Sequence, residues 1–242
     1  MSAPSPQVIR WGAERARCTP WRGDGRLAHL APASDSQILS TGFIRHCLGC
    51  LAGEGYAGVV TSALAPPEQA GFIDAGFDVE QRLHLLAHDL SDLPEPPGPA
   101  DVRLRRTRHQ DMEEVVRIDQ SAFDEFWTMD AAALKDATEA TPRARFRLAL
   151  AGAGAQPAGY AITGKAGNRG YLQRLAVGRE ATGRGIGRLL VSDGLRWLKR
   201  RGAERCLVNT QEGNQRALDL YERMGFRLQS GGLAVLGARI EP

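Results

Sequence analysis

Long apolar runs, disulfide patterns and metal-ligand spacings are all missing from this chain of 242 residues. No stretch reaches the roughly 18 apolar residues that a membrane-spanning helix needs, and the first residues lack the apolar segment of a signal peptide. A reducing cytoplasm is the simplest setting for the four cysteines, so we expect a cytoplasmic protein with no membrane partner. Cys47 and Cys50 lie beside His46, but no second pair stands at zinc-finger spacing, so we interpret them as packing residues and expect no metal site.

Neither sign of charge predominates, because 31 Lys and Arg residues nearly balance 28 Asp and Glu residues and the formal net charge is only +3. Nucleic acid is therefore not an expected partner. A local basic group is interpreted as a solvated face, and DNA binding through it is kept as a third hypothesis: Arg103, Arg105, Arg106 and Arg108. The hydrophobic fraction of 43% is enough for the core of one large domain or two small ones.

Two common phosphate-binding motifs are absent as well. No P-loop run ending in Gly-Lys-Ser/Thr occurs, and the richest glycine loop is spaced Gly-x-Gly-x-Gly, not Gly-x-Gly-x-x-Gly. What is present is a strand-like run, Arg174 to Val177, followed by Gly183, Gly185 and Gly187 and then a helical pattern. Glycines let backbone N–H groups approach a phosphate, and a helix N-terminus adds the positive end of its dipole. The loop therefore predicts a pyrophosphate site.

A second motif follows the glycine loop. Residues 214–226 read Asn-x-x-Ala-x-x-x-Tyr-x-x-x-Gly-Phe. The two motifs, in this order, resemble the GCN5-related N-acetyltransferase (GNAT) superfamily, whose members bind acetyl-CoA. The resemblance covers residues 100–242, with one departure, because Thr182 stands where the superfamily usually has Arg or Gln.

The resemblance implies an α+β fold, a mixed αβα sandwich of the acyl-CoA N-acyltransferase type with helices on both sides of a central mixed sheet. It also implies acetyl-CoA as co-substrate, with the N–H of Val177 polarising the thioester carbonyl and the side chains of Arg184 and Arg188 near the pyrophosphate. The positions that it assigns to acetyl-CoA are Leu175, Ala176, Val177, Thr182, Gly183, Arg184, Gly185, Ile186, Gly187, Arg188, Asn214, Ala217 and Tyr221.

Acetyl transfer to an amine needs an acid and a base. The resemblance assigns protonation of the leaving thiolate to the phenol of Tyr221. For the base, the candidates are Asp124 and Glu125, which follow the first predicted helix on the side where the acceptor is expected to enter. Tyr171 and Gln173 also lie on the predicted fourth strand, but a glutamine can only position a water.

The predicted function is acetyl-CoA-dependent transfer of an acetyl group to a primary amine by direct attack in a ternary complex. The acceptor is a small molecule, a protein N-terminus or a lysine, and the chain is a monomer or a homodimer. The alternative is a non-catalytic acyl-CoA-binding sensor, which would not need an acid at Tyr221.

Four prolines between residues 94 and 99 predict a stiff linker at 93–99. It separates a half-domain, residues 1–92, from an acetyltransferase domain, residues 100–242. For the second domain, periodicity and turn residues predict helices capped by Asp111 and Asp130, helices ending near 201 and spanning 214–224, and strands at 101–105, 145–151, 160–165, 171–177, 205–210, 226–229 and 234–240. The last two strands are predicted as a pair.

The first half is interpreted as a degenerate half-copy of the second, with a strand–helix–strand–helix–strand series over 26–88. Arg26-Leu27-Ala28 repeats Arg174-Leu175-Ala176, and at nearly the same offset Ile38 falls on Ile186, Val59-Val60 on Leu207-Val208 and Gly76-Phe77 on Gly225-Phe226. Residues 31–36 lack the glycines of the later loop, so we expect a structural role for this half.

Overall fold

The structure is a computed structural model that describes residues 7–22, 24–34, 37–93 and 100–240. It divides into two compact units, one comprising Met1–Leu85, Asn209–Gly213 and Gln229–Pro242 and the other Leu86–Val208 and Asn214–Leu228. The units differ from the predicted division in that the end of the chain groups with the first unit. Most of the predicted linker, residues 94–99, lies outside the described residues, and the division at 93–99 stays a prediction.

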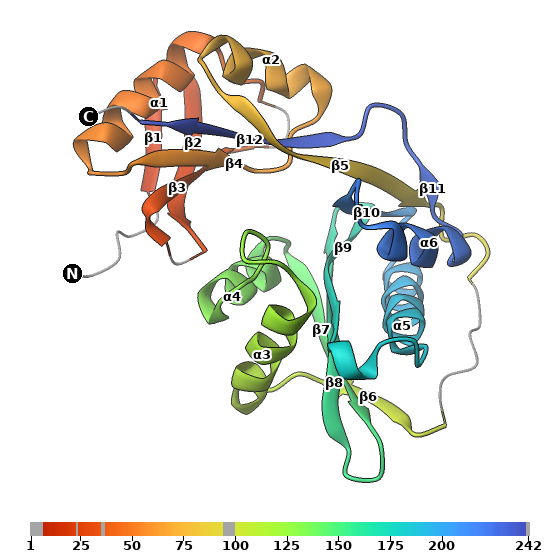
Figure 1. Ribbon diagram of the computed structural model, residues 1–242. Helices are drawn as coiled ribbons and strands as arrows, with labels where there is room; N and C mark the ends of the chain where they lie inside the picture. The colour runs from red at the N-terminus through yellow and green to blue at the C-terminus, as the bar shows by residue number, and fades with distance from the viewer. Residues whose placement is uncertain (1–6, 23, 35–36, 94–99, 241–242) are drawn as a thin grey trace. The chain divides into compact units, whose positions relative to one another are not determined.

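The first unit is a sheet with two helices (Figure 1). Its strands lie in the order β1-β2-β3-β4-β12-β5. The element bounds are β1 Gln7–Trp11, β2 Glu14–Trp21, β3 Asp24–Pro32, α1 Thr41–Gly53, β4 Gly58–Thr61, α2 Pro66–Asp74, β5 Asp78–His88 and β12 Leu233–Arg239. The hydroxyl of Ser40 caps α1 by accepting a hydrogen bond from the N–H of Phe43, and Phe43, Ile44, Cys47 and Leu51 form its buried face.

The predicted series over 26–88 is confirmed as β3-α1-β4-α2-β5, but two strands before it were missed. In β2 the inward residues Ala16 and Cys18 are small and alternate with arginines, so the strand lacks the bulky apolar alternation that marks a half-buried strand. The match of Ile38 to Ile186 is wrong, because Ile38 is 60% exposed and precedes α1, whereas the neighbouring Leu39 is buried.

The second unit is a sheet with helices on both faces, which confirms the predicted fold class. Its strands lie in the order β10-β9-β8-β7-β6, with β9 parallel to β10 and antiparallel to β8. The bounds are β6 Val102–Arg106, η1 His109–Asp111, α3 Met112–Ala122, α4 Ala131–Glu139, β7 Arg143–Ala151, β8 Gln156–Ala166, β9 Arg169–Val177, η2 Arg179–Ala181, α5 Ile186–Arg200, β10 Arg205–Gln211, α6 Gln215–Arg223 and β11 Arg227–Leu228.

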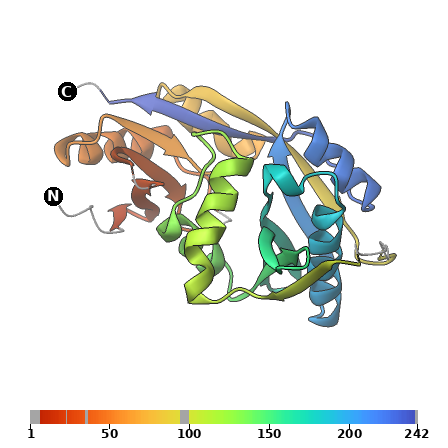
Figure 2. The same cartoon turned by 60° about the horizontal axis from the view of Figure 1, so that its bottom comes forward.

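Two hydrophobic cores cover the two faces of this sheet. Val115, Ile118 and Leu134 of α3 and α4 pack with Tyr160 and Ile162 on one face. Residues of α5 and α6 form the other core, together with Leu172 and Cys206. Figure 2 shows α3 (yellow-green) and α5 (blue) on opposite sides of the strands.

The two units repeat one order of elements. The series β2-β3-α1-β4-α2-β5 matches β8-β9-α5-β10-α6-β11, and in both the first pair of strands is antiparallel and the next parallel. Gly76 and Gly225, which the sequence pairs, both have positive φ, +96° and +88°. These observations agree with the predicted half-copy.

Two local predictions are wrong. The side chain of Asp111 does not cap α3; it accepts hydrogen bonds from the guanidinium of Arg105 and from the N–H of Arg108. The two last strands do not pair with each other, because β11 pairs with Leu86 and Ala87 of β5 and β12 lies between β4 and β5. By contrast, Asp130 caps α4 as predicted, accepting from the N–H of Ala133 at 2.7 Å. Among the described residues, no helix is long and apolar enough to cross a membrane.

Candidate functional site

The second unit contains a cavity of about 610 Å³ where the end of β9, the glycine loop and α6 meet. Most of the residues that the sequence assigned to acetyl-CoA line it: Leu175, Ala176, Val177, Gly183, Gly185, Ile186, Gly187, Arg188, Asn214 and Ala217. Residues far apart in the sequence therefore surround one space. Their binding roles remain predictions.

Strand β9 reaches this cavity with one edge unpaired. Its pairing with β10 ends at Tyr171 opposite Leu207, so within the described residues Leu172–Val177 have no partner in β10. On the other edge β9 stays paired with β8 as far as Val177. Because the N–H of Gly178 donates to Ala158 on β8 and successive amides point to opposite edges, the N–H of Val177 points to the unpaired edge. The free edge therefore leaves backbone donors and acceptors of β9 unpaired beside the cavity.

The glycine loop leads directly into α5. Gly183 and Gly185 both have φ +79°, and Gly185 is the N-cap of the helix, without a side-chain capping bond. Gly187 stands close to α6, since a Cβ there would lie 3.2 Å from the end of the Leu220 side chain. The N–H groups at the start of α5 are thus free of a capping side chain and suited to an anion.

Helix α6 contributes charged residues that the sequence reasoning missed. Arg216 and Arg223 line the cavity together with Asp219 and Leu220, and Arg223 pairs with Asp219 at 3.3 Å. Their spacing of three, four and seven residues places them on one helix face with Ala217, a signal present in the sequence. Asn214 caps α6 by accepting from the N–H of Ala217 at 3.1 Å, as one of its two predicted roles requires.

Two predicted loop residues, Thr182 and Arg184, lie outside the cavity lining. The hydroxyl of Thr182 donates to the carbonyl of Gly178. The guanidinium of Arg184 forms an ion pair with the exposed carboxylate of Asp101. The positive charges that face the cavity therefore come from Arg188 and from α6.

Tyr221 is buried beside the cavity and does not line it. It packs against Phe226 at a ring distance of 5.6 Å, and the next residue toward the N-terminus, Leu220, does line the cavity. Burial raises the pKa of the phenol, the nearby Cys206 adds to this, and the charge of Arg174 opposes it. The phenol is thus protonated at neutral pH.

Asp124 and Glu125 are exposed and lie outside the cavity lining, although the adjacent Ala122 and Phe123 line it. They belong to residues 123–129, which we call the α3–α4 segment. One oxygen of Asp124 accepts from the N–H of Trp127 at 3.1 Å. The sequence reasoning did not assign Phe123 to the site.

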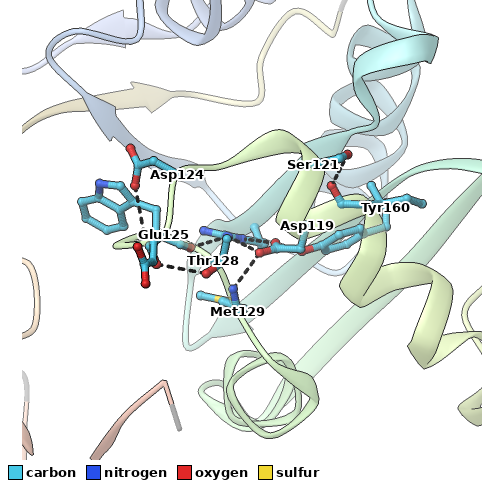
Figure 3. A network of polar contacts seen from close by, with 10 residues as sticks. Asp119, Ser121, Asp124, Glu125, Thr128, Met129 and Tyr160 are labelled. Carbon is cyan, nitrogen blue, oxygen red and sulfur yellow. Dashed lines mark hydrogen bonds and ion pairs between the residues drawn. The ribbon is translucent and has the colours of Figure 1, made fainter. Parts of the chain in front are cut away.

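A buried ion pair lies beneath this segment, and the sequence reasoning missed it. Asp119 of α3 is fully buried, and Arg174 of β9 donates to both of its oxygens, Nε at 2.8 Å and Nη2 at 2.7 Å. The hydroxyl of Tyr160 and the N–H of Met129 also donate to Asp119. Figure 3 shows Asp119 between Tyr160 and Met129, with Asp124 and Glu125 further along the segment.

Gln173 lies next to this pair at an irregularity in β9. Opposite Ile162 and Thr163 stand Arg174 and Leu172, so Gln173 is the extra residue of a β-bulge. Its Oε1 is buried without a hydrogen-bond partner, and a Cβ at Gly164 would lie 2.5 Å from that atom. The bulge turns Arg174 and Ala176 toward the α3 face while Leu172 faces α5.

Known proteins share both the motifs and the fold of this chain. Residues 112–226 match the family model described as Acetyltransferase (GNAT) family. The mycothiol acetyltransferase of Mycobacteroides abscessus is 31% identical over 209 residues, which cover 81% of this chain and 69% of that protein. The one from Rhodococcus jostii is 33% identical over 180 residues, which cover 64% of this chain and only 59% of that protein.

Solved structures with less than 20% identity share the fold. A tandem GNAT protein from the clavulanic acid biosynthesis pathway, solved without AcCoA, is 17% identical with a TM-score of 0.72, covering 100% of this chain and 85% of its own. A GCN5-related N-acetyltransferase from Kribbella flavida is 15% identical with a TM-score of 0.68, and the match covers 98% of this chain and 90% of that one. Family model, relatives and fold agree, and the chain belongs to the GNAT family of acetyltransferases.

Proposed function

We propose that this chain is an acetyl-CoA-dependent N-acetyltransferase that acetylates a primary amine by direct attack in a ternary complex. The observation that carries the proposal is the cavity in which the unpaired edge of β9, the glycine loop and α6 meet. GNAT proteins use acetyl-CoA as co-substrate, and family membership makes acetyl transfer the reaction to test first.

The residues present fit a long anionic thioester. The free backbone groups of Leu175–Val177 suit an amide-containing arm, since an arm of this kind offers donors and acceptors to a strand edge. The uncapped start of α5, with Arg188 and Arg216 at the cavity, suits the pyrophosphate. When bound, acetyl-CoA supplies the acetyl group and a thiolate as leaving group.

Three groups of the chain are proposed to act on the reacting atoms. The N–H of Val177 polarises the carbonyl and stabilises the oxyanion, because it points to the unpaired edge. The phenol of Tyr221, held protonated by burial, gives a proton to the leaving thiolate. Asp124 or Glu125 takes the ammonium proton through water, since both carboxylates are exposed just beyond Phe123.

The proposed acceptor is an amine. Of the four arginines considered for DNA binding, Arg105 is engaged by both oxygens of Asp111 at 2.6 and 2.7 Å.

The test is release of CoA from acetyl-CoA in the presence of a panel of amines, with the acetylated product identified by mass spectrometry. The panel contains small primary amines, amino acids, peptides with a free N-terminus or lysine, and the acceptor of the mycothiol acetyltransferases. Amine-dependent release with matching product is expected. Binding of acetyl-CoA without release for any amine favours the sensor alternative, and no binding contradicts both.

A further inference from the structure

The ion pair of Asp119 and Arg174 is the most deeply buried charge in the second unit that the proposed chemistry does not use. The carboxylate is 0% and the guanidinium 7% exposed. Asp119 accepts four hydrogen bonds, which is the full capacity of a carboxylate. Such a pair contributes little net stability compared with apolar residues of the same shape, so its presence calls for another explanation.

The further contacts of this ion pair are with the α3–α4 segment, residues 123–129. Asp119 holds the N–H of Met129 at 2.7 Å, and Arg174 Nη2 donates to the carbonyl of Trp127 at 2.7 Å. The guanidinium carbon of Arg174 also lies 3.5 Å from the centre of the Phe123 ring. The pair therefore holds the segment at its beginning, near its end and at its last residue.

Bonds inside the segment make it one piece. The N–H groups of Trp127 and Thr128 both donate to the carbonyl of Asp124 at 3.0 Å, and the Thr128 hydroxyl donates to the carbonyl of Glu125. Fixing Phe123, Trp127 and Met129 thus also fixes where Asp124 and Glu125 stand.

The first residue of this segment, Phe123, lines the cavity at a place that no donor-binding element supplies. The lining consists of the end of β9, Ala181, the glycine loop with the start of α5, α6, and finally Ala122 and Phe123. The end of β9, the glycine loop with the start of α5, and α6 carry positions assigned to acetyl-CoA, which leaves the side of Ala122 and Phe123 for the acceptor.

We propose that the Asp119–Arg174 pair positions the α3–α4 segment as the acceptor wall, so that acceptor binding depends on two charges that no substrate touches. This proposal rests on the proposed acetyl transfer. Donor binding is independent of the pair, because Leu175–Val177 are held by β8 at Ala161, Tyr160 and Gly159. Arg174 and Asp119 are positioning residues, not catalytic ones.

The test replaces the network by apolar residues of similar shape, in the triple variant Asp119→Leu, Tyr160→Phe, Arg174→Met. Removing all three partners avoids leaving one buried charge unpaired, so the unit stays folded. A milder variant, Arg174→Lys, keeps the charge but loses the two-point geometry to Asp119 and the bond to Trp127. The matched control is Arg145→Met, Arg147→Met, Asp193→Leu, which removes an ion-pair network of the same unit: Arg145 donates to both oxygens of Asp193 at 2.7 and 2.9 Å, and Arg147 lies 3.5 Å from the same carboxylate.

Kinetics are measured with the amine that the wild type acetylates best, and acetyl-CoA affinity by calorimetry. Both network variants are expected to raise the amine KM about tenfold or more, because the wall is displaced, with a smaller change in kcat and acetyl-CoA affinity within about threefold. The control is expected to leave all three values near wild type.

The possible failures are distinguishable. If the wild type binds acetyl-CoA but acetylates no amine, the proposed function fails and the positioning role fails with it. If the wild type turns over and the network variants keep the wild-type amine KM, or lose acetyl-CoA affinity in parallel, the positioning role alone is wrong.

Discussion

The glycines at the start of α5 allow stability and ligand binding to be separated experimentally. Gly185 has φ +79°, so alanine there costs roughly 1–2 kcal/mol of unfolding free energy. Gly187 lies within the helix, where alanine gains up to about 1 kcal/mol in helix propensity. Its Cβ would press on the flexible end of Leu220 at 3.2 Å, which offsets part of that gain. Gly187→Ala is therefore expected to unfold within about 1 kcal/mol of wild type.

The affinity for acetyl-CoA is expected to fall in both glycine variants, including the one whose stability hardly changes. A methyl group at position 187 stands at the cavity, between Leu220 and Val177. Close approach of a pyrophosphate is then blocked, and we expect acetyl-CoA affinity to fall at least about tenfold, equivalent to about 1.4 kcal/mol. Gly185→Ala is expected to lose both stability and affinity.

The control is Gly202→Ala, at the other end of α5. Gly202 has φ +71° and open space around its Cβ position, and it lies away from the cavity. It should lose as much unfolding free energy in urea as Gly185→Ala while keeping wild-type affinity in calorimetry. Wild-type affinity in Gly187→Ala would show that this glycine serves helix packing alone and would refute the reasoning.

Three further outcomes are expected. Tyr221→Phe should lower kcat by about 10²- to 10⁴-fold and leave acetyl-CoA affinity unchanged, and an unchanged kcat would exclude the phenol as the acid. Asp130→Ala removes the cap of α4 and should cost about 1 kcal/mol in urea unfolding, whereas a loss below a few tenths would mean that the bond to Ala133 contributes nothing. Asp111 has its pKa lowered first by the hydrogen bond from Arg105, so its contribution is complete above the unfolded-state pKa of about 3.9 and is lost as pH falls through the lower folded-state value. Asp111→Asn should therefore be less stable than wild type at pH 7, with the difference shrinking below about pH 4; a pH-independent difference would contradict the assignment.

The parts of the site that could be predicted are those that depend only on residues close together in the sequence. Gly183 and Gly185 mark a left-handed loop before a helix, and Asn214 marks the start of the next helix, so their positions followed from neighbouring residues alone. The spacing of Arg216 and Arg223 along the sequence also predicts that they share one face of α6, although the sequence analysis did not use that signal.

The parts that could not be predicted depend on partners far away in the sequence. Asp119 and Arg174 are 55 residues apart, and no local pattern indicates that a helix carboxylate and a strand guanidinium will meet. The bulge at Gln173 interrupts an alternation that reads as regular in the sequence. Periodicity also predicted the last strands without indicating their partners, since hydrogen-bonding edges look alike in every strand.

Calorimetric titration of acetyl-CoA into the wild type and Gly185→Glu, with Gly202→Ala as the control for helix strain, tests the central claim most directly. The account predicts micromolar binding by the wild type and by Gly202→Ala, and no binding by Gly185→Glu, whose carboxylate would repel the pyrophosphate at the start of α5. No binding by the wild type, or equal binding by Gly185→Glu, would contradict the assignment of this cavity to acetyl-CoA.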